Sequence, residues 1–354
     1  MSMTRRFIGD RRAIALAATI FVGISGAGLG NAAPRSATWD PTCTAGAPSI
    51  VRWVRTSAMT ERPALDRWCA GVGPPARMEG RQAAEVFAGP FVVASWNTHV
   101  GAGDIDAFVG DLRSGRLTGT PVADFVLLLQ EVYRGGLDVP SLAGVRWASA
   151  EQPPGSAHAR VAVTGAAERL GLSAIYVPSM RNGRPGATSE DRGNAILSSV
   201  RLSDVTAIEL PLERQRRVAI AATVTVRGPD GSAQPVRLVC THFTNMVMHH
   251  AWILSESGRL RQARALAQTL PTDGSLILGG DLNSWFGFRD AAYRQLAAKL
   301  SRASAEDRRP TFGPLRLDHL LFRLPATWRT EVRRVDRKYG SDHYPLVAMI
   351  DAPR

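Results

Sequence analysis

The chain has 354 residues, of which 45% are hydrophobic and 21% are charged. This length and composition exclude a chain too polar to bury a core, and they allow one large domain or two smaller ones. The formal net charge of +12 comes almost entirely from arginine, because Lys299 and Lys338 are the only lysines. Such a charge favours a polyanionic partner, nucleic acid or an anionic membrane, although a GC-rich genome would produce the same arginine bias without one.

The first 32 residues have the features of a secretory signal peptide. Four arginines precede residue 13, residues 13–29 are small and apolar, and Gly30–Ala33 supply small residues for cleavage. Residues 4–8 (TRRFI) resemble the start of a twin-arginine signal. The alternative is a membrane anchor, but the apolar stretch is shorter than the roughly 20 residues that a spanning helix needs. We therefore expect a secreted or periplasmic protein.

Residues 33–88 show no sustained hydrophobic period apart from a short helical pattern at residues 64–71. We interpret them as an N-terminal extension that contains Cys43 and Cys69. Secretion permits a disulfide bond between these two cysteines, which would stabilise the fold by on the order of 3 kcal/mol in the chain-entropy model. Cys240 lies in an apolar strand pattern, so we expect it to be a buried free thiol.

Residues 89–354 carry the patterns of a mixed α/β domain. Runs of apolar and β-forming residues predict strands at residues 91–97, 123–131, 172–178, 194–200, 216–228, 236–243, 274–283, 317–324 and 343–351. Helical patterns occur at residues 104–115, 256–270 and 289–300, and the second places Leu260, Ala263, Leu266, Ala267 and Leu270 on one face. Helices mixed with consecutive strands predict one α/β domain with more than one sheet.

Polar and ionisable residues stand where several of these strands begin or end. They are Asn97, Glu131, Arg192, Asn194, His242, Asp281, Asn283, Asp318, Asp342 and His343. Strand ends at one rim of a sheet can meet in one cleft, where unpaired buried carboxylates would be costly. A divalent cation would relieve that cost, and carboxylate and amide oxygens suit Mg²⁺ or Mn²⁺ better than zinc.

The motifs around these residues resemble the endonuclease/exonuclease/phosphatase superfamily, which includes DNase I, AP endonucleases of the exonuclease III type, bacterial sphingomyelinases and inositol polyphosphate 5-phosphatases. They are SWNTH (95–99), LLLQEV (127–132), RGNAILS (192–198), CTHF (240–243), GGDLNS (279–284), LDHLLF (317–322) and GSDHYPLV (340–347). Each motif alone is weak, but their order along residues 91–351 is specific. The resemblance implies a four-layer α/β/β/α sandwich with its site at one rim of two paired sheets.

The resemblance also implies a role for each residue. The metal ligands would be Glu131, Asn97 and Asp342, and Arg192 and Asn194 would bind the substrate phosphate. The catalytic residues would be His343, Asp281, Asn283, Asp318 and His242. In phosphodiester hydrolysis Asp281 and Asn283 would orient or activate water, while His343, held by Asp318, would be a base if neutral or a phosphate clamp if protonated. A neighbouring carboxylate favours the second role, but the sequence leaves the general base open.

These positions also have ordinary structural explanations. Asn97 and Asp281 are common turn residues, Asp318 could pair with a neighbouring arginine, His242 could be a satisfied core histidine, and Arg192 could be a solvated charge. If there were no functional site, all of these structural explanations would have to be true at once. One position departs from the family pattern: His99 stands where AP endonucleases usually carry aspartate, which argues against an AP-site repair enzyme.

The substrate class stays open between two enzymes. We predict a DNase I-like nuclease that binds nucleic acid through arginine-rich loops at residues 180–193 and 212–217. The alternative is a sphingomyelinase-like phosphodiesterase whose apolar residues 245–254 dip into a membrane, unless those residues pack under the next helix. A binding protein with an inactive site would usually lack Glu131, Asp281 or His343, which are all present. No obligate protein partner is inferred, and we expect a monomer.

Overall fold

The computed structural model describes residues 51–352, except residues 82, 141–148, 151–159, 183–188, 229 and 246–251; for residues 149–150 and 252–257 it describes the backbone alone. The described residues belong to one compact unit, Ser36–Arg354. The signal peptide predicted at residues 1–32 and Cys43 of the predicted disulfide lie outside the described residues, so both stay predictions. Among the described residues, no helix is long and apolar enough to cross a membrane.

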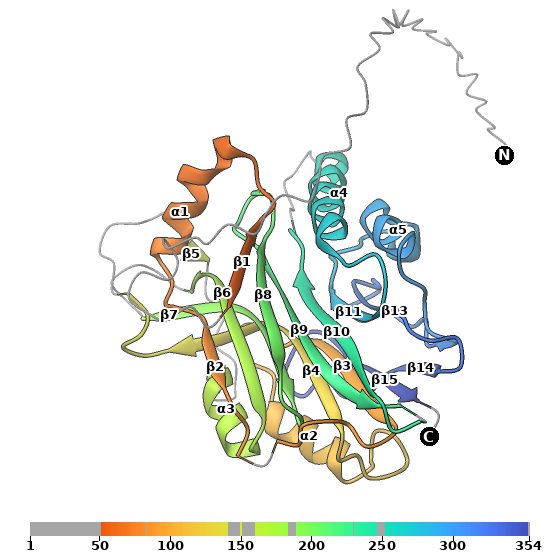
Figure 1. Ribbon diagram of the computed structural model, residues 1–354. Coiled ribbons are helices and arrows are strands. Elements are labelled where there is room, and N and C mark those ends of the chain that lie inside the picture. Colours follow the sequence, from red (N-terminus) through yellow and green to blue (C-terminus); the bar gives the residue numbers. More distant parts are fainter. Residues whose placement is uncertain are drawn as a thin grey trace, which may run out of the picture. The chain divides into compact units, whose positions relative to one another are not determined.

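The described strands form two mixed sheets (Figure 1). The six-stranded sheet has the order β1 (Arg52–Arg55), β8 (Ser203–Glu209), β9 (Val218–Arg227), β10 (Ala233–His242), β11 (Ser275–Asp281) and β13 (Asp318–Arg323). The nine-stranded sheet has the order β12 (Ala305–Glu306), β14 (Arg329–Arg334), β15 (Leu346–Asp351), β3 (Phe91–Asn97), β4 (Phe125–Gly135), β7 (Glu190–Ser198), β6 (Ser173–Asn182) and β2 (Ala76–Met78), with β5 (Ser149–Ala150) paired to β6.

Helices flank both sheets (Figure 1). Apolar residues of α2 (Ile105–Arg113) and α3 (Val163–Leu170) pack in one cluster with the nine-stranded sheet. Those of α4 (Trp252–Thr269) and α5 (Ala291–Ala297) pack with the six-stranded sheet. A third cluster joins the two sheets to each other. These three apolar interfaces confirm the predicted four-layer α/β/β/α sandwich.

The packing of strand β3 explains why its sequence is mostly apolar. Phe91 and Val93 belong to the cluster between the sheets, whereas Val92, Ala94 and Trp96 belong to the cluster beneath the helices. Because side chains alternate across a strand, both faces of β3 are buried, and a strand buried on both faces has a near-continuous apolar sequence.

Residues 51–88 contribute strands to the edges of both sheets. β1 pairs in parallel with β8, and β2 pairs antiparallel to β6. The short helix α1 (Arg62–Ala70) follows the 3₁₀ turn η1 (Met59–Glu61) and packs Trp68 against Met180 of β6. Phe87 stacks on Phe91 with ring centroids 4.9 Å apart. This segment, which we interpreted as an extension, therefore packs against the main body of the sandwich.

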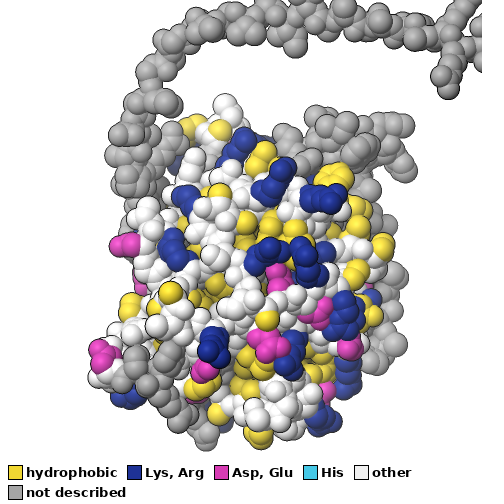
Figure 2. Space-filling view, turned by 90° about the vertical axis from the view of Figure 1, so that its right-hand side faces the viewer, with side chains coloured by type: hydrophobic (Ala, Val, Ile, Leu, Met, Phe, Trp, Pro, Cys, Tyr) yellow, Lys and Arg dark blue, Asp and Glu magenta, His cyan; other side chains and the backbone are white. Residues whose placement is uncertain are grey.

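The surface retains the basic character of the composition. Figure 2 shows one face of the molecule, on which Lys and Arg side chains lie among hydrophobic ones with fewer acidic side chains between them.

The thiol of Cys240 is free and fully buried, as predicted from its apolar strand.

Candidate active site

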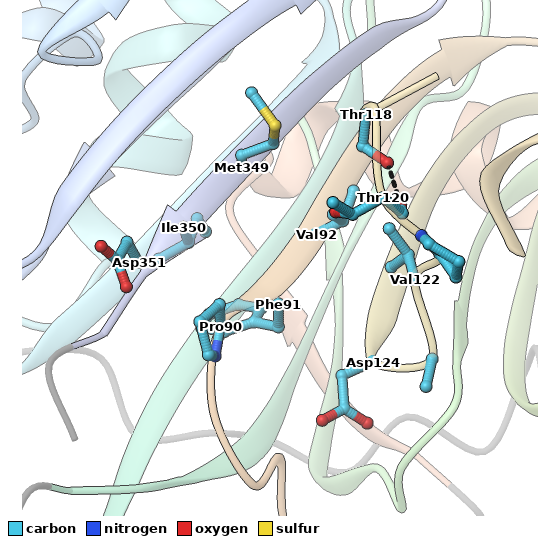
Figure 3. Close-up of a pocket in the computed structure, with 12 residues that line it drawn as sticks. Pro90, Phe91, Val92, Thr118, Thr120, Val122, Asp124, Met349, Ile350 and Asp351 are labelled. Carbon is cyan, nitrogen blue, oxygen red and sulfur yellow. Dashed lines mark hydrogen bonds between the residues drawn. The ribbon is translucent and has the colours of Figure 1, made fainter. Parts of the chain in front are cut away.

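A cavity of about 340 Å³ lies where β3 begins and β15 ends (Figure 3). Of the residues that line it, only Asp124 and Asp351 are ionisable. One of them, Asp124, accepts a hydrogen bond from the backbone N–H of Ala88 at 3.3 Å. None of the residues singled out from the sequence lines this cavity, and its side chains offer no acid–base pair for chemistry. The predicted site residue Asn97 lies at the other end of β3, as the last residue of that strand.

The strand register of the six-stranded sheet brings three of the predicted residues into one row. The Cα of His242 in β10 is paired with that of Asp281 in β11, which is paired in turn with that of Asp318 in β13. Residues paired across neighbouring strands project from the same face of a sheet. The three side chains therefore lie side by side, although some 76 residues separate the first from the last in the sequence.

Asn97 connects this row to the nine-stranded sheet. Its Nδ2 donates a hydrogen bond to Oδ2 of Asp281 at 3.0 Å, and its Oδ1 accepts one from the backbone N–H of His99 at 3.0 Å. The other carboxylate oxygen of Asp281, Oδ1, accepts from the backbone N–H of Asn283 at 2.8 Å. The side-chain Nδ2 of Asn283 donates to the carbonyl of Phe243, which leaves its Oδ1 to face other groups.

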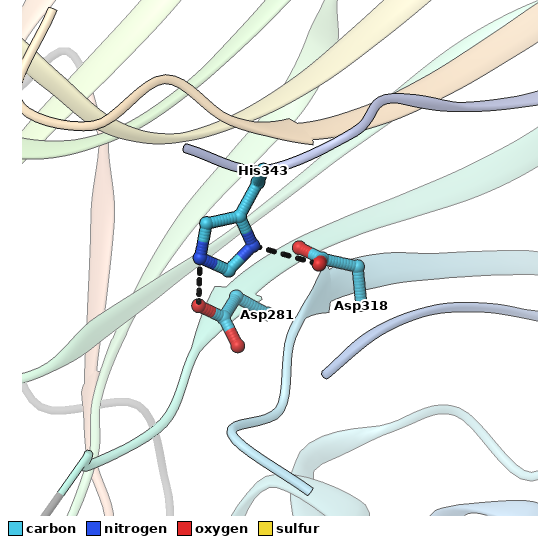
Figure 4. Close-up of side chains that lie close together, drawn as sticks. All are labelled: Asp281, Asp318 and His343. Atoms are coloured by element: carbon cyan, nitrogen blue, oxygen red, sulfur yellow. Dashed lines mark hydrogen bonds and ion pairs between the residues drawn. The ribbon is translucent and has the colours of Figure 1, made fainter. Parts of the chain in front are cut away.

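His343 lies between two buried carboxylates (Figure 4). Its Nδ1 is 2.8 Å from Oδ2 of Asp318, and its Nε2 is 3.9 Å from Oδ2 of Asp281. One ligand atom from each of these three residues falls within 4.8 Å of the others. The second carboxylate oxygen of Asp318 is buried and has no hydrogen-bond partner among the described residues.

The two carboxylates determine the charge of His343. Burial opposes the charged imidazolium, but Asp318 and then Asp281 and Asp342 outweigh this effect and raise the pKa of His343 to about 10. Burial and the nearby charge of Asp318 raise the pKa of Asp281 to about 6. At neutral pH the histidine is therefore protonated, while Asp281 is ionised and keeps an appreciable proton affinity.

Glu131 reaches the site from a strained position in the nine-stranded sheet. A β-bulge between Leu129 and Val132 interrupts the pairing of β4 with β7, and the backbone of Glu131 has φ = 52°. Positive φ is uncommon for a residue other than glycine and is a conformation in which functional sites store strain. His99 and Asn283 share it, with φ = 50° and 48°. Three residues with positive φ thus lie within or next to the predicted site.

The Glu131 carboxylate faces basic groups. Its Oε2 is 3.7 Å from Arg192 Nη1, and its Oε1 is 3.9 Å from His242 Nδ1. Burial disfavours the charged form, but the charges of Arg192, Arg217 and His343 overcome this and lower the pKa of Glu131. Glu131 is consequently anionic at neutral pH.

Arg217 completes this region, although the sequence analysis placed it in a basic loop at residues 212–217. It is 3% exposed, and its Nη1 lies 3.1 Å from Nδ1 of His242. A guanidinium can only donate, so Nδ1 of His242 must be the acceptor and the proton must be on Nε2. That nitrogen lies 3.5 Å from Oδ2 of Asp281. Burial, followed by the charge of Arg217, holds the pKa of His242 well below its usual range, which fits a neutral ring.

The arginines of the predicted loop at residues 212–217 differ in where they lie. Arg216 is fully buried and pairs with Glu209 at 2.7 Å, and Arg217 belongs to the site, so only Arg214 of its arginines is exposed. In the other predicted loop, residues 180–193, residues 183–188 lie outside the described part. In the predicted apolar segment 245–254, residues 246–251 lie outside it as well, and Trp252 begins α4.

A family-level comparison agrees with this geometry. Residues 94–343 match the model of the Endonuclease/Exonuclease/phosphatase family. The chain belongs to this family. Its members are generally hydrolytic phosphoesterases that depend on divalent metals. The sequence matches no curated protein.

Solved structures resemble this chain at low sequence identity. An endonuclease/exonuclease/phosphatase protein from Beutenbergia cavernae is 18% identical over 75% of this chain and 72% of its own, with a TM-score of 0.52, and this likeness shows the fold alone. Sphingomyelinase C from Streptomyces griseocarneus is 17% identical over 73% and 99%, with a TM-score of 0.43. Truncated TDP2 from Caenorhabditis elegans is 16% identical over 74% and 98%, with a TM-score of 0.43.

All residues selected through the family motifs lie in this one region of the sandwich. Asn194 and Arg192 line a small recess together with Glu131, Arg217 and His242. The side chain of Asn194 itself donates to the carbonyl of Val218 at 2.8 Å, so it is held in place by the backbone. Asp342 lies at the mouth, half-buried, with its Oδ1 4.0 Å from Nε2 of His343 and 3.7 Å from Nδ1 of His99.

His99 and Arg217 are the site residues that the sequence analysis missed. His99 stands two positions after Asn97, and its departure from the usual aspartate was taken only as an argument against an AP-site repair enzyme. No local sequence signal distinguishes Arg217 from the other arginines. Its position in the site comes from the fold, because Arg217 directly precedes β9 at a buried end of that strand.

The donors at this site fit a divalent cation. Asp281, Asp318 and His343 each bring a ligand atom within 4.8 Å of the others, and Oδ1 of Asp318 is buried without a hydrogen-bond partner in the described part of the chain. Glu131 and Asp342 add hard oxygen atoms, and the amide of Asn97 adds another polar group. Hard oxygen donors are those that Mg²⁺ and Mn²⁺ prefer. A cation would also offset the repulsion between Asp281 and Asp318, which raises the pKa of Asp281.

Proposed function

We propose that the protein is a secreted phosphodiesterase of this family that depends on Mg²⁺ or Mn²⁺, and specifically a DNase I-like endonuclease. One observation carries the proposal: a protonated His343 held between Asp318 and Asp281, beside an anionic Glu131. Secretion is supported by the sequence of residues 1–32.

The metal, held by Glu131 with Asn97 and Asp342, would supply charge neutralisation at the phosphoryl oxygens. The chain's own residues would do the rest. Protonated His343, kept charged by Asp318, donates a hydrogen bond to a phosphate oxygen and stabilises the charge that develops there. Asp281 accepts the proton of the attacking water, because its raised pKa makes it a better base than an ordinary aspartate.

Five other residues would support these groups. Asn97 Nδ2 and the backbone N–H of Asn283 fix the two oxygens of Asp281, and Asn283 Oδ1 is left to contact the water. The neutral His242, whose tautomer is set by Arg217, presents an N–H toward Asp281. Arg192, with its Nε buried and unpaired within the described part of the chain, lies ready to contact a phosphate.

Nucleic acid is the better-supported substrate. Two guanidinium groups, of Arg192 and Arg217, line the recess beside Glu131, and phosphate contacts dominate affinity for nucleic acid. The net charge of the whole chain is +12. The alternative, a lipid substrate, depends on the apolar segment 245–254, in which Asn245 has the only described side chain.

A panel of substrates tests the proposal. Mature protein is incubated with Mg²⁺ or Mn²⁺ and plasmid DNA, RNA or sphingomyelin liposomes, with and without EDTA. We expect plasmid nicking that EDTA and His343→Ala abolish. Asp351→Asn, a carboxylate change in the distant cavity, is the matched control and should nick DNA normally. Hydrolysis of liposomes without nicking of DNA would refute the endonuclease and favour the lipid phosphodiesterase.

A further inference from the structure

Exposed aromatic side chains follow the catalytic motif directly. Among the described residues, the large hydrophobic side chains that are exposed are Met59, Leu137, Trp285 and Phe286. Trp285 is 38% exposed and stands two residues after Asn283, so their Cα atoms are at most about 7.6 Å apart. An exposed tryptophan beside a phosphodiesterase site is available to substrate, since leaving such a ring in water has a free-energy cost that contact with a ligand would recover.

The backbone around Trp285 is held in place. Asn283 turns the chain with φ = 48°, and the backbone N–H of Trp285 donates to the carbonyl of Asn283 at 3.0 Å. Ser284, between them, is fully buried, and its Oγ lies 2.7 Å from Nε2 of His319 and 2.9 Å from the carbonyl of Arg316. The loop that carries the tryptophan is thus anchored at the residue before it.

Guanidinium groups gather on the same segment. Phe288, in the 3₁₀ turn η2 (Gly287–Arg289), has the guanidinium carbons of Arg302, Arg308 and Arg316 at 5.3, 5.1 and 5.7 Å from its ring centroid. Arg316 pairs with Glu306 at 3.2 Å. Arg302 and Arg308 are exposed and form no ion pair with a described residue. The carboxylates of Glu306, Asp318 and Asp307 act on the buried Arg316, so Arg302 and Arg308 are the exposed cations over Phe288, three residues after Trp285.

We propose that Trp285, with Arg302 and Arg308, binds an unpaired stretch of nucleic acid next to the scissile phosphodiester. The ring of Trp285 stacks on a base, and the two guanidinium groups contact the phosphates that follow. The inference rests on the proposed function, because it names the form of nucleic acid that the same site takes. Aromatic rings combined with a positive surface are typical of proteins that bind single strands. In a duplex the base faces are already stacked on each other and are closed to a side chain.

The charges favour nucleic acid over a membrane as the occupant. A segment that inserts into a lipid interface needs a broad apolar face. Among the described residues, the large apolar side chains exposed on this segment are those of Trp285 and Phe286, and the exposed Arg289 follows them. This alternation of ring and cation complements a strand of bases and phosphates.

Binding of a labelled oligonucleotide tests the inference. All proteins carry His343→Ala, so the probe stays intact in Mg²⁺, and fluorescence anisotropy reports the affinity for fluorescein-labelled oligo(dT) and for a duplex of equal length. We expect Trp285→Ala to weaken oligo(dT) binding roughly tenfold and duplex binding by less than about twofold. Leu137→Ala removes an exposed hydrophobic residue from another strand end and serves as the matched control, with no change in either affinity.

Arg308→Ala separates the charged part of the surface from the ring. It should weaken both probes and reduce the slope of log affinity against log salt by about one, because one phosphate contact is lost. Equal losses for both probes in Trp285→Ala, or no loss, would overturn the stacking surface. If plasmid nicking by protein with an intact His343 persists in that case, the endonuclease proposal stands while this inference fails. Binding of sphingomyelin vesicles that depends on Trp285, without oligonucleotide binding, would overturn both.

Discussion

His343 carries its proton at neutral pH because two buried carboxylates surround it, and this fixes the expected pH dependence. Activity requires Asp281 deprotonated, so it should rise as pH increases through about 6. It also requires His343 protonated, so it should fall as pH increases through about 10. The plot of kcat/KM against pH, measured with bis-p-nitrophenyl phosphate, should therefore be a broad bell. A single rise near pH 6.5 with no alkaline fall would instead make His343 the general base.

Asp318 is the residue that should set the alkaline limb of that profile. Its Oδ2 accepts the 2.8 Å hydrogen bond from His343. Asp318→Asn removes the negative charge, so the pKa of His343 should fall and the alkaline limb should move to lower pH, with a rate loss of roughly a hundredfold. Asp307→Asn changes a carboxylate that pairs with Arg309 at the surface and should leave the profile in place. An unmoved limb in Asp318→Asn would contradict this role.

At this scale, the sequence was most informative about which single side chains belong to the site. Asp281, Asp318 and His343 could be predicted because charged groups beside apolar strands are costly unless they have partners or a function. Arg217 could not, because the same residue type at the neighbouring position, Arg216, is a structural ion-pair partner of Glu209. Which of two adjacent arginines enters the site depends on the face to which each projects.

At the scale of elements, the double glycine before Asp281 lets β11 pack between its neighbours. A Cβ on Gly280 would lie 2.0 Å from the carbonyl oxygen of Thr241, its register partner in β10. We expect Gly280→Ala to lower the free energy of unfolding by about 3 kcal/mol, because the strands must separate to accommodate the methyl group.

Helix α2 offers the matched control for that substitution. A Cβ on Gly110 would meet nothing within 4 Å, so Gly110→Ala should raise the free energy of unfolding by up to about 1 kcal/mol through helix propensity. Urea titrations followed by circular dichroism measure both variants. Equal stability of Gly280→Ala and the native protein would show that β10 and β11 are not packed as described.

Most strands buried on both faces could be predicted from sequence, whereas the short edge strands and the interior strand β8 were not. The prediction of residues 91–97 coincides with β3 because every residue of that strand is buried. β14 was not predicted, since only Thr330 and Val332 of its six residues are buried and the others are charged. β1 and β2 have four and three residues, and their strand conformation comes from pairing with β8 and β6.

At the scale of the whole molecule, the site joins both sheets, so a bound cation should stabilise the entire sandwich. Glu131 and Asn97 come from the nine-stranded sheet, whereas Asp281 and Asp318 come from the other. A ligand at a hundredfold excess over its dissociation constant contributes about 2.7 kcal/mol. We expect Mg²⁺ to raise Tm by roughly 5 °C in differential scanning fluorimetry. Glu131→Gln should lose most of that rise, and an equal rise in this variant would place the cation elsewhere.

The resemblance to the family implied the four layers and the rim at which the site lies. It could not predict the row formed by His242, Asp281 and Asp318, which depends on the register of β10, β11 and β13. Nor could it predict the contact of Arg217 with His242, since that contact joins the start of one strand to the end of the next.

The central claim is that side chains from both sheets form one metal-dependent centre for phosphodiester hydrolysis. Its most direct test is the rate of hydrolysis of bis-p-nitrophenyl phosphate by mature protein that has been stripped of metal and then given Mg²⁺ or Mn²⁺. The account predicts no turnover in the stripped protein, turnover when the cation is restored, and none in Glu131→Gln or His343→Ala. Turnover that persists in EDTA, or that survives both substitutions, would contradict it.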